Sequence, residues 1–108
     1  MPTLNECMDS IRKLVELKGH EDNIKDVSQK LLFAVIEIAE AADIIKKHGI
    51  SLLNVQTIEE ELIDAIFYVL DTYGLIHRAF ETSVNPDLMF KYKLRKNLKR
   101  DYRYGRPK

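Results

Sequence analysis

Apolar residues recur every three to four positions along most of the chain, a period that places them on one face of an α-helix. The first segment of this kind carries Ile11 and Val15 at helical spacing. It opens with a capping box in which Thr3 and Glu6 can satisfy each other's backbone amides. Gly19 is suited to the left-handed conformation that ends many helices. The pattern therefore predicts a helix between Thr3 and Gly19.

Start and stop signals divide the rest of the chain into three more helices. The second begins near Asp22 or Asn23 and stops at Gly49, after a cationic last turn that suits the negative end of the helix dipole. The third opens with another capping box at residues 57–60 and runs to about residue 79 or 80.

The fourth helix is marked by Asn85-Pro86-Asp87, which supplies a cap, a proline for the first turn and an acid at the positive end of the dipole. We expect it to run to about Arg100 and residues 102–108 to form a tail. Gly74, inside the third helix, predicts a weak point or a kink there.

The composition agrees with one small helical domain. The chain has 108 residues with few glycines and prolines, and no apolar run approaches the ~20 residues that span a bilayer. The single cysteine, Cys7, excludes an internal disulfide and favours a reducing compartment, and no signal peptide is recognised. We expect an all-α, four-helix bundle-like domain over residues 1–108 in the cytoplasm, with a basic tail at about 101–108.

The net charge of zero hides an asymmetry. Residues 1–90 contain 8 basic and 16 acidic residues, whereas residues 91–108 contain 9 basic residues and one acid, Asp101. The balance excludes a protein that binds polyanions through bulk charge alone, so nucleic acid is not the expected partner. An acidic body with a basic end suggests a site where a cation meets an anionic ligand.

The second helix carries few charges in an otherwise apolar stretch. From Leu31 to Ile45 the only charged residues are Glu37, Glu40 and Asp43. Glu37 and Glu40 are three residues apart and therefore share a helix face, from which Asp43 deviates.

The third helix repeats this pattern. Glu61, Asp64, Tyr68 and Asp71 fall within a stripe about 80° wide at 100° per residue. Neither acidic segment contains the lysine or arginine partners that solvated helix faces usually carry. These acids could simply form the outward faces of two helices. Two pairs without basic partners favour a site instead.

Converging carboxylates repel one another unless a cation neutralises them, and ligands that are all oxygen favour Mg²⁺, or Mn²⁺, over zinc. One of the four acids of the two pairs is expected to act as a general base, although the pattern does not single one out. The remaining surface of both helices is so apolar that we expect a second copy to cover it, in a homodimer or homotetramer.

Three blocks of the sequence resemble a known family. Glu37-x-x-Glu40 followed by Glu61-x-x-Asp64 is similar to the E-x-x-E and E-x-x-D signature of the all-α nucleoside triphosphate pyrophosphohydrolases of the MazG-like superfamily. The run EELID at 60–64 resembles the family's E-E-L-x-D block, and Lys93-x-x-x-Asn97-x-x-Arg100 is similar to its C-terminal segment. The resemblance covers residues 31–100, with the order and spacing preserved.

The resemblance implies an oligomeric helical bundle and Mg²⁺ bound by Glu37, Glu40, Glu61 and Asp64. It also implies hydrolysis of a nucleoside triphosphate between its α and β phosphates, which yields the monophosphate and pyrophosphate.

Several further residues are candidates for contact with such a ligand. Lys93, Asn97 and Arg100 lie on one face of the fourth helix, where two cations and an amide suit phosphate. A solvated basic surface is the simpler interpretation. Tyr68 could hydrogen-bond a carboxylate or the ligand, or belong to the core, and Asp71 could bind a second ion or hold a lysine. The phenylalanines of the first three helices are assigned to the core; they are Phe33, Phe67 and Phe80.

Three other functions fit parts of the sequence. A di-iron carboxylate bundle would need Glu-x-x-His, and neither pair has the histidine. A non-catalytic helical dimer could bind RNA or a partner through its basic C-terminal helix, without a metal. An inactive relative would have lost some of the four acids, all of which are present.

Overall fold

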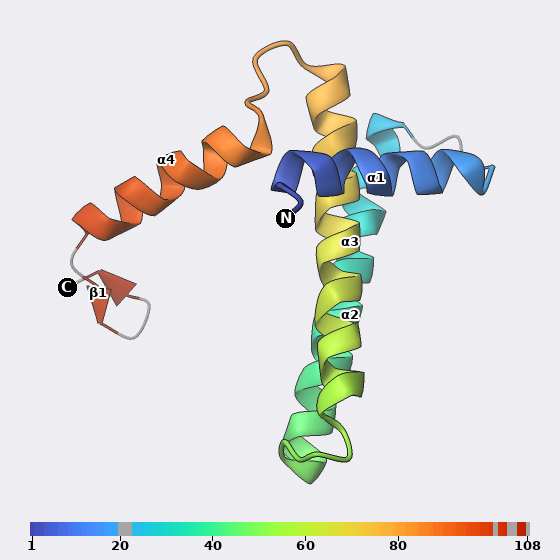
Figure 1. Cartoon of the computed structure of the whole chain (residues 1–108), viewed down its shortest axis with the longest axis vertical. Helices are drawn as coiled ribbons and strands as arrows, with labels where there is room; N and C mark the ends of the chain where they lie inside the picture. The colour runs from blue at the N-terminus through green and yellow to red at the C-terminus, as the bar shows by residue number, and fades with distance from the viewer. Residues whose placement is uncertain (20–22, 101, 104–105, 108) are drawn as a thin grey trace.

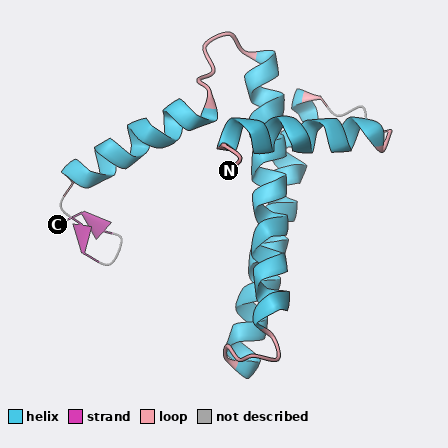
Figure 2. Cartoon of the chain, viewed as in Figure 1, coloured by secondary structure: helices cyan, strands magenta, loops and turns pink. Residues whose placement is uncertain are grey.

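The computed structural model describes residues 1–19, 23–100, 102–103 and 106–107, and nearly all of them are helical (Figures 1 and 2). The elements are α1 (Leu4–Leu17), the 3₁₀-helix η1 (Ile24–Asp26), α2 (Val27–His48), α3 (Val55–Ala79), α4 (Pro86–Lys99), β1 (Tyr102–Arg103) and β2 (Arg106–Pro107). The prediction of an all-α chain with four helices is confirmed. Among the described residues, none of the helices combines the length and apolar character needed to cross a bilayer.

The long helices α2 and α3 run antiparallel, side by side, over most of their length (Figure 1). Helix α1 crosses this pair near the end opposite the 49–54 connection, and α4 leads away from it (Figure 1). The first turn of α4 is tied to α1, because the Asp87 Oδ1 atom accepts a hydrogen bond of 2.9 Å from the Leu4 backbone N–H. Within one chain the helices therefore form a crossed hairpin from which α4 projects.

The contact between α2 and α3 follows a repeat of three and four residues. The least exposed positions of α2 in this contact are Ala34, Glu37, Ala41 and Ile44. Those of α3 are Ile58, Glu61, Ala65, Tyr68, Thr72 and Leu75. Alanine at three of these positions lets the two backbones approach closely, and the same repeat places two glutamates between the helices.

The crossing of α1 over α3 explains Gly74. Gly74 does not interrupt the helix, because α3 is continuous from Val55 to Ala79. A Cβ atom at residue 74 would lie 2.8 Å from Cγ of Arg12 and 3.2 Å from Cγ of Met8, both on α1. The glycine is required for the close approach of the two helices, not for bending. Met8 joins Ile11 and Leu70 in the small core beneath this crossing.

Two predicted helix starts were wrong by a few residues. Helix α3 begins at Val55, so the capping box predicted at 57–60 lies within its first turns. The Asn54 side chain instead closes the preceding loop, accepting from Ser51 N–H at 2.9 Å and donating to the Gly49 carbonyl at 2.9 Å. Sequence alone does not distinguish one capping residue from another three positions away.

Asn23 caps a helix as predicted, but the helix is η1. The Asn23 side chain accepts from Lys25 N–H at 2.9 Å, and α2 follows from Val27. Asp22, the other predicted start, lies outside the described residues.

The start of the fourth helix is confirmed, with Asn85 accepting from Asp87 N–H at 2.9 Å and Pro86 in the first turn. Beyond it, the region predicted to be a tail contains β1 and β2, which pair antiparallel with Tyr102 opposite Pro107. Asp101 lies outside the described residues.

Candidate functional site

The acidic residues predicted to form a site come from the contact between α2 and α3. Glu37 occupies a contact position of α2, and Glu61 occupies one of α3, so both are half-buried between the helices. Asp64 lies one turn along α3 and is exposed. Each of these three residues places a carboxylate oxygen within 4.8 Å of those of the other two. We refer to Glu37, Glu61 and Asp64 as the carboxylate cluster.

Glu40, the fourth predicted acid, borders this cluster from the solvent side and interacts with Glu61. The two acidic lines of the sequence thus converge across the helix pair and do not point into solvent on opposite sides. Within residues 31–45 of α2 and 59–73 of α3 the sequence has no lysine or arginine.

The pKa values at the carboxylate cluster are governed by the interactions of its acidic side chains with one another and with Glu40. Hydrogen bonding to Glu61 and the negative charge of Glu61 raise the pKa of Glu40. The pKa of Glu61 is also raised, first by hydrogen bonding to Glu37 and then by burial and the charges of Glu37 and Asp64, while the hydrogen bond with Glu40 acts in the opposite direction. Glu40 and Glu61 therefore release their protons less readily than isolated glutamates do, and a bound cation would compete with those protons.

Stability of the metal-free protein should fall as the pH rises. A carboxyl group whose pKa is raised on folding stabilises the folded state below its ordinary pKa of 4.5, and the contribution is lost as the pH rises through the raised pKa. We expect a lower melting temperature at pH 7.5 than at pH 5, and recovery on addition of Mg²⁺ at pH 7.5.

Circular dichroism melts of variants separate this effect from other charges. Glu40→Gln should flatten the pH dependence. Glu16→Gln should leave the decline between pH 5 and pH 7.5 unchanged, because the hydrogen bond from Arg78 lowers the pKa of Glu16 and its contribution to stability varies only below the ordinary pKa of 4.5. A melting temperature that Mg²⁺ leaves unchanged at pH 7.5 would contradict a metal site in this cluster.

The donor set fits a hard divalent cation. All the oxygens are carboxylate oxygens, the ligands that Mg²⁺ and Mn²⁺ prefer. The Oε2 atom of Glu61 is buried and finds no hydrogen-bond donor among the residues that the structure describes. Such an atom is costly to bury unless something compensates it, and a cation between the three carboxylates would do so.

A groove beside the cluster runs between α1 and the α2–α3 pair. It has a volume of about 280 Å³. One wall is the apolar face of α1, formed by Ile11, Leu14 and Val15. The opposite wall consists of Glu37, Asp64, Phe67, Tyr68 and Asp71. The carboxylates therefore lie at one end of a partly apolar groove.

Tyr68 lies in this groove one turn from Asp64. Its ring packs against Phe33 of α2, with the centroids 5.5 Å apart and the planes at 49°. Phe33 was assigned to the core from the sequence, but its side chain is 39% exposed, and Phe67 and Phe80 are also largely exposed. The groove therefore contains an aromatic surface next to the carboxylate cluster.

Asp71 lies one turn further along α3 and is buried. Its Oδ2 atom accepts from the Lys30 ammonium at 2.5 Å, and its Oδ1 atom accepts from the Arg12 guanidinium. Of the two roles considered from the sequence, the described contacts are those of a residue that holds a lysine. The arginine comes from α1, so Asp71 connects all three helices of the groove.

The basic face of α4 lies apart from the carboxylate cluster within one chain. Lys93, Asn97 and Arg100 are on the exposed helix that leads away from the α2–α3 pair (Figure 1). The groove at the carboxylates is lined by residues of α1, α2 and α3. The cations and acids of the sequence prediction are therefore not brought together in a single chain.

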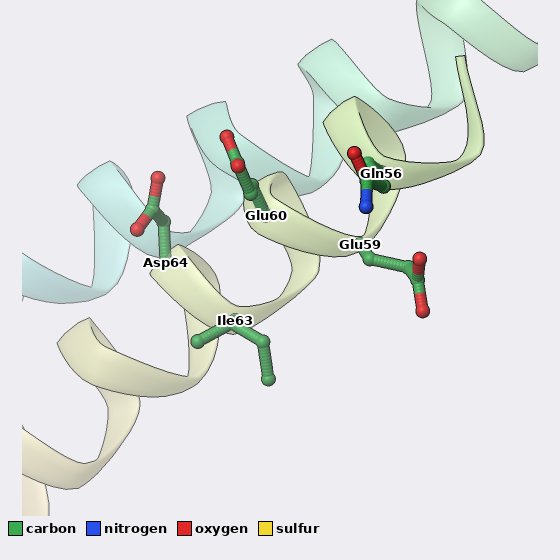
Figure 3. A pocket seen from close by; sticks show the side chains of 5 residues that line it. All are labelled: Gln56, Glu59, Glu60, Ile63 and Asp64. Carbon is green, nitrogen blue, oxygen red and sulfur yellow. The ribbon is translucent and has the colours of Figure 1, made fainter. Parts of the chain in front are cut away.

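A second depression, of about 500 Å³, opens on the other side of Asp64. Its lining comes from the first turns of α3 and consists of Gln56, Glu59, Glu60, Ile63 and Asp64. Figure 3 shows Glu60 and Asp64 projecting from the same side of α3, while Glu59 points away from them. Glu59 is thus an acid of the same helix that takes no part in the carboxylate cluster.

Sequence reasoning missed the cationic and aromatic partners on α2. Lys30 lies just before the acidic segment, and its pairing with Asp71 depends on the register between two helices far apart in sequence. A signal was nevertheless present, because Lys30, Phe33 and Glu37 are spaced by three and four residues and so share one helix face.

Comparisons with known proteins yield no relative: no protein-family model, curated protein or solved structure matches the chain. The sequence and structure together describe an all-α, four-helix protein with a cluster of two glutamates and one aspartate that could hold a metal ion.

Proposed function

We propose that the chain hydrolyses a nucleoside triphosphate between its α and β phosphates, giving a nucleoside monophosphate and pyrophosphate. The observation that carries this proposal is the convergence of Glu37, Glu61 and Asp64 within 4.8 Å at the end of a groove. The family resemblance of the three sequence blocks agrees with it. Four acids from two helices suit a metal-dependent reaction of a polyphosphate better than a purely structural role.

Glu37, Glu61 and Asp64 would hold Mg²⁺ or Mn²⁺, with Glu40 at the edge. A bound ion would offset the charge of the phosphates and polarise the phosphorus that is attacked. Glu37 and Glu61 are fixed between two packed helices, so their carboxylates are already in position before a ligand arrives. Glu40 is exposed beside them, and we assign it to orient the attacking water through a carboxylate oxygen.

The phosphate contacts proposed for Lys93, Asn97 and Arg100 require a second chain. These residues project from the body of their own chain, on a basic helix, whereas the α2–α3 body is acidic (Figure 1). Charge complementarity favours docking of α4 of one chain on the acidic body of another. A symmetric dimer would then place the cations of each α4 beside the carboxylates of its partner.

The apolar surface of the α2–α3 pair also supports a homodimer or homotetramer. Large apolar side chains that are roughly half exposed cover both helices; they include Leu32, Val35, Ile36, Ile38, Leu62, Ile63, Ile66 and Val69. This exposed apolar surface is larger than the apolar patches that soluble monomeric proteins usually expose to water. A second copy of the same helix pair is the partner that these matching faces fit.

The proposed activity is tested by assaying pyrophosphate release from a panel of ribonucleoside and deoxyribonucleoside triphosphates. We expect release with Mg²⁺ or Mn²⁺ and none in chelator, with the nucleoside monophosphate as the second product. Release of inorganic phosphate together with a nucleoside diphosphate would mean that the bond between the β and γ phosphates is cleaved, which would contradict the proposal. No turnover of any nucleotide, in a protein that melts cooperatively, would contradict the proposal.

The exposure of α4 from Phe90 onward favours a second candidate, a non-catalytic dimer that binds RNA or a partner through this helix. Binding of RNA that is unchanged in chelator, together with no turnover in the same assay, would support it over the hydrolase.

A further inference from the structure

Beyond the carboxylate cluster, an ordered series of residue pairs across α2 and α3 follows the groove and the cavity next to it. Glu37 lies opposite Asp64 in the cluster, Phe33 packs on Tyr68, and Lys30 binds Asp71. From the cluster outward, successive pairs are separated by four and then three residues. They run toward the N-terminus on α2 and toward the C-terminus on α3. The pairs therefore occupy successive helical turns and span about 10 Å from the first to the last.

The last two pairs enclose a cavity of about 300 Å³ that adjoins the groove. The two regions share Val15, Tyr68 and Asp71 in their linings. The cavity thus combines an apolar side chain, two aromatic rings and a few polar groups beside an acidic end. With a divalent cation held at the acidic end, these surfaces fit a ligand that has an anionic group at one end and a planar ring with a polar edge at the other.

The polar groups of the cavity differ in how firmly they are held. The Asp26 carboxylate already accepts from the Asn23 backbone N–H at 2.7 Å, and Gln29 is exposed. The Lys30 side chain is only 12% exposed and is fixed by its 2.5 Å contact with Asp71. Lys30 is therefore a firmly held hydrogen-bond donor in the lining of the cavity, and an ammonium group offers donors only.

We propose that this cavity binds the base of the substrate nucleotide and that Lys30 selects the base by donating a hydrogen bond to a carbonyl oxygen on its edge. The inference rests on the proposed function and names the substrate class: nucleotides of uracil, thymine or guanine. Cytosine and adenine carry an amino group where these bases carry that oxygen. In those two bases the amino group, a donor, would face the Lys30 ammonium, which is also a donor. The hydrogen bond between the base and the charged lysine would then be lost.

Asp71 is a positioning residue in this arrangement. It touches Lys30 and not the base, and its second oxygen is held by Arg12 of α1. The aromatic pair Phe33 and Tyr68 contributes to binding of every base, since each base has a planar apolar face. The selectivity therefore depends on Lys30, and the general affinity depends on the aromatic pair.

Calorimetric titration of the full chain with dUMP, dCMP, dGMP and dAMP in Mg²⁺ tests the proposal without requiring hydrolysis. The wild-type protein should bind dUMP and dGMP about tenfold more tightly than dCMP and dAMP, the range expected for one charge-assisted hydrogen bond. Lys30→Met should lower affinity for the first two only, so that the four values converge. Lys25→Met, on the exposed surface of η1, is the matched control and should leave the ranking unchanged.

A second variant distinguishes loss of base selection from loss of the folded structure. Phe33→Leu should weaken all four nucleotides to a similar extent while keeping the ranking, and the melting temperatures of all variants are measured in parallel. Equal binding of the four bases by the wild-type protein, no binding of any of them, or an equal loss for all four in Lys30→Met would overturn the assignment. Base-selective binding without pyrophosphate release would instead refute the proposed hydrolysis and leave the base site standing.

Discussion

Replacement of Glu61 by glutamine is expected to abolish pyrophosphate release, lowering the rate by at least about 100-fold. Glu61 contributes the one buried carboxylate oxygen of the cluster that has no donor among the described residues, and it lies between Glu37 and Glu40. Glutamine has nearly the same shape but no charge, so the loss would report the missing ligand and not a missing side chain. The rate is measured with saturating Mg²⁺ and each active nucleotide.

The matched control is Glu59→Gln, which removes the same charge from the same helix at a side chain that points away from Asp64 (Figure 3). It should retain the wild-type rate. Glu61→Gln should also relieve repulsion among the remaining acids, so the metal-free variant should melt no lower than the wild type. Its melting temperature should no longer respond to Mg²⁺. Equal rates for wild type and Glu61→Gln would refute the assigned role of this residue.

The same variant tests whether α4 acts across a dimer. If the acids of one chain work with Lys93 of another, Glu61→Gln and Lys93→Met are each inactive alone. After mixing and subunit exchange, half of the dimers are mixed and each has one intact site, so about a quarter of the wild-type activity returns. No recovery in a mixture shown to exchange subunits would contradict a site that combines the cations of one chain with the acids of another.

Asp71→Asn is expected to cost about 3 to 5 kcal/mol of folding stability, the largest loss that we predict for a single residue of the groove. The Asp71 side chain is 4% exposed, and its two oxygens bind Arg12 and Lys30 from two other helices. The amide would leave these cations beside a neutral group in a poorly solvated position. Urea denaturation followed by circular dichroism gives the free energy of unfolding.

Asp43→Asn provides the comparison, because Asp43 pairs with Lys47 at 3.0 Å while both side chains are more than half exposed. Its loss should change the unfolding free energy by no more than about 0.5 kcal/mol. Similar values for the two variants would mean that the contacts of Asp71 do not stabilise the packing of α1 on the helix pair.

The helices themselves could be predicted from local signals. Thr3, Gly49 and Asn85 mark helix ends through bonds made within a few residues, and each functions in the structure as expected. The convergence of Glu37 with Glu61 and Asp64 could also be anticipated, since apolar helices without basic partners must bring their acids together or expose them.

The remaining features depend on contacts that no local pattern contains. The burial of Asp71 depends on Lys30, which is 41 residues away, and on Arg12, which is 59 residues away. The direction of α4 depends on the connection at 80–85, where Tyr73 donates to the Val84 carbonyl at 2.5 Å. Phe33 was placed in the core because a single sequence does not show which apolar face lacks a neighbour.

The absent side chain at Gly74 determines how far α1 can descend toward the helix pair. Because α1 also forms the apolar wall of the groove, the width available to a ligand is set at a residue that no ligand would touch. A larger residue there would act as a spacer that pushes Arg12 outward and widens the groove, and it would also disturb the buried contact between Arg12 and Asp71. The width of the groove and the ion pair that holds Asp71 are thus linked through one helix crossing.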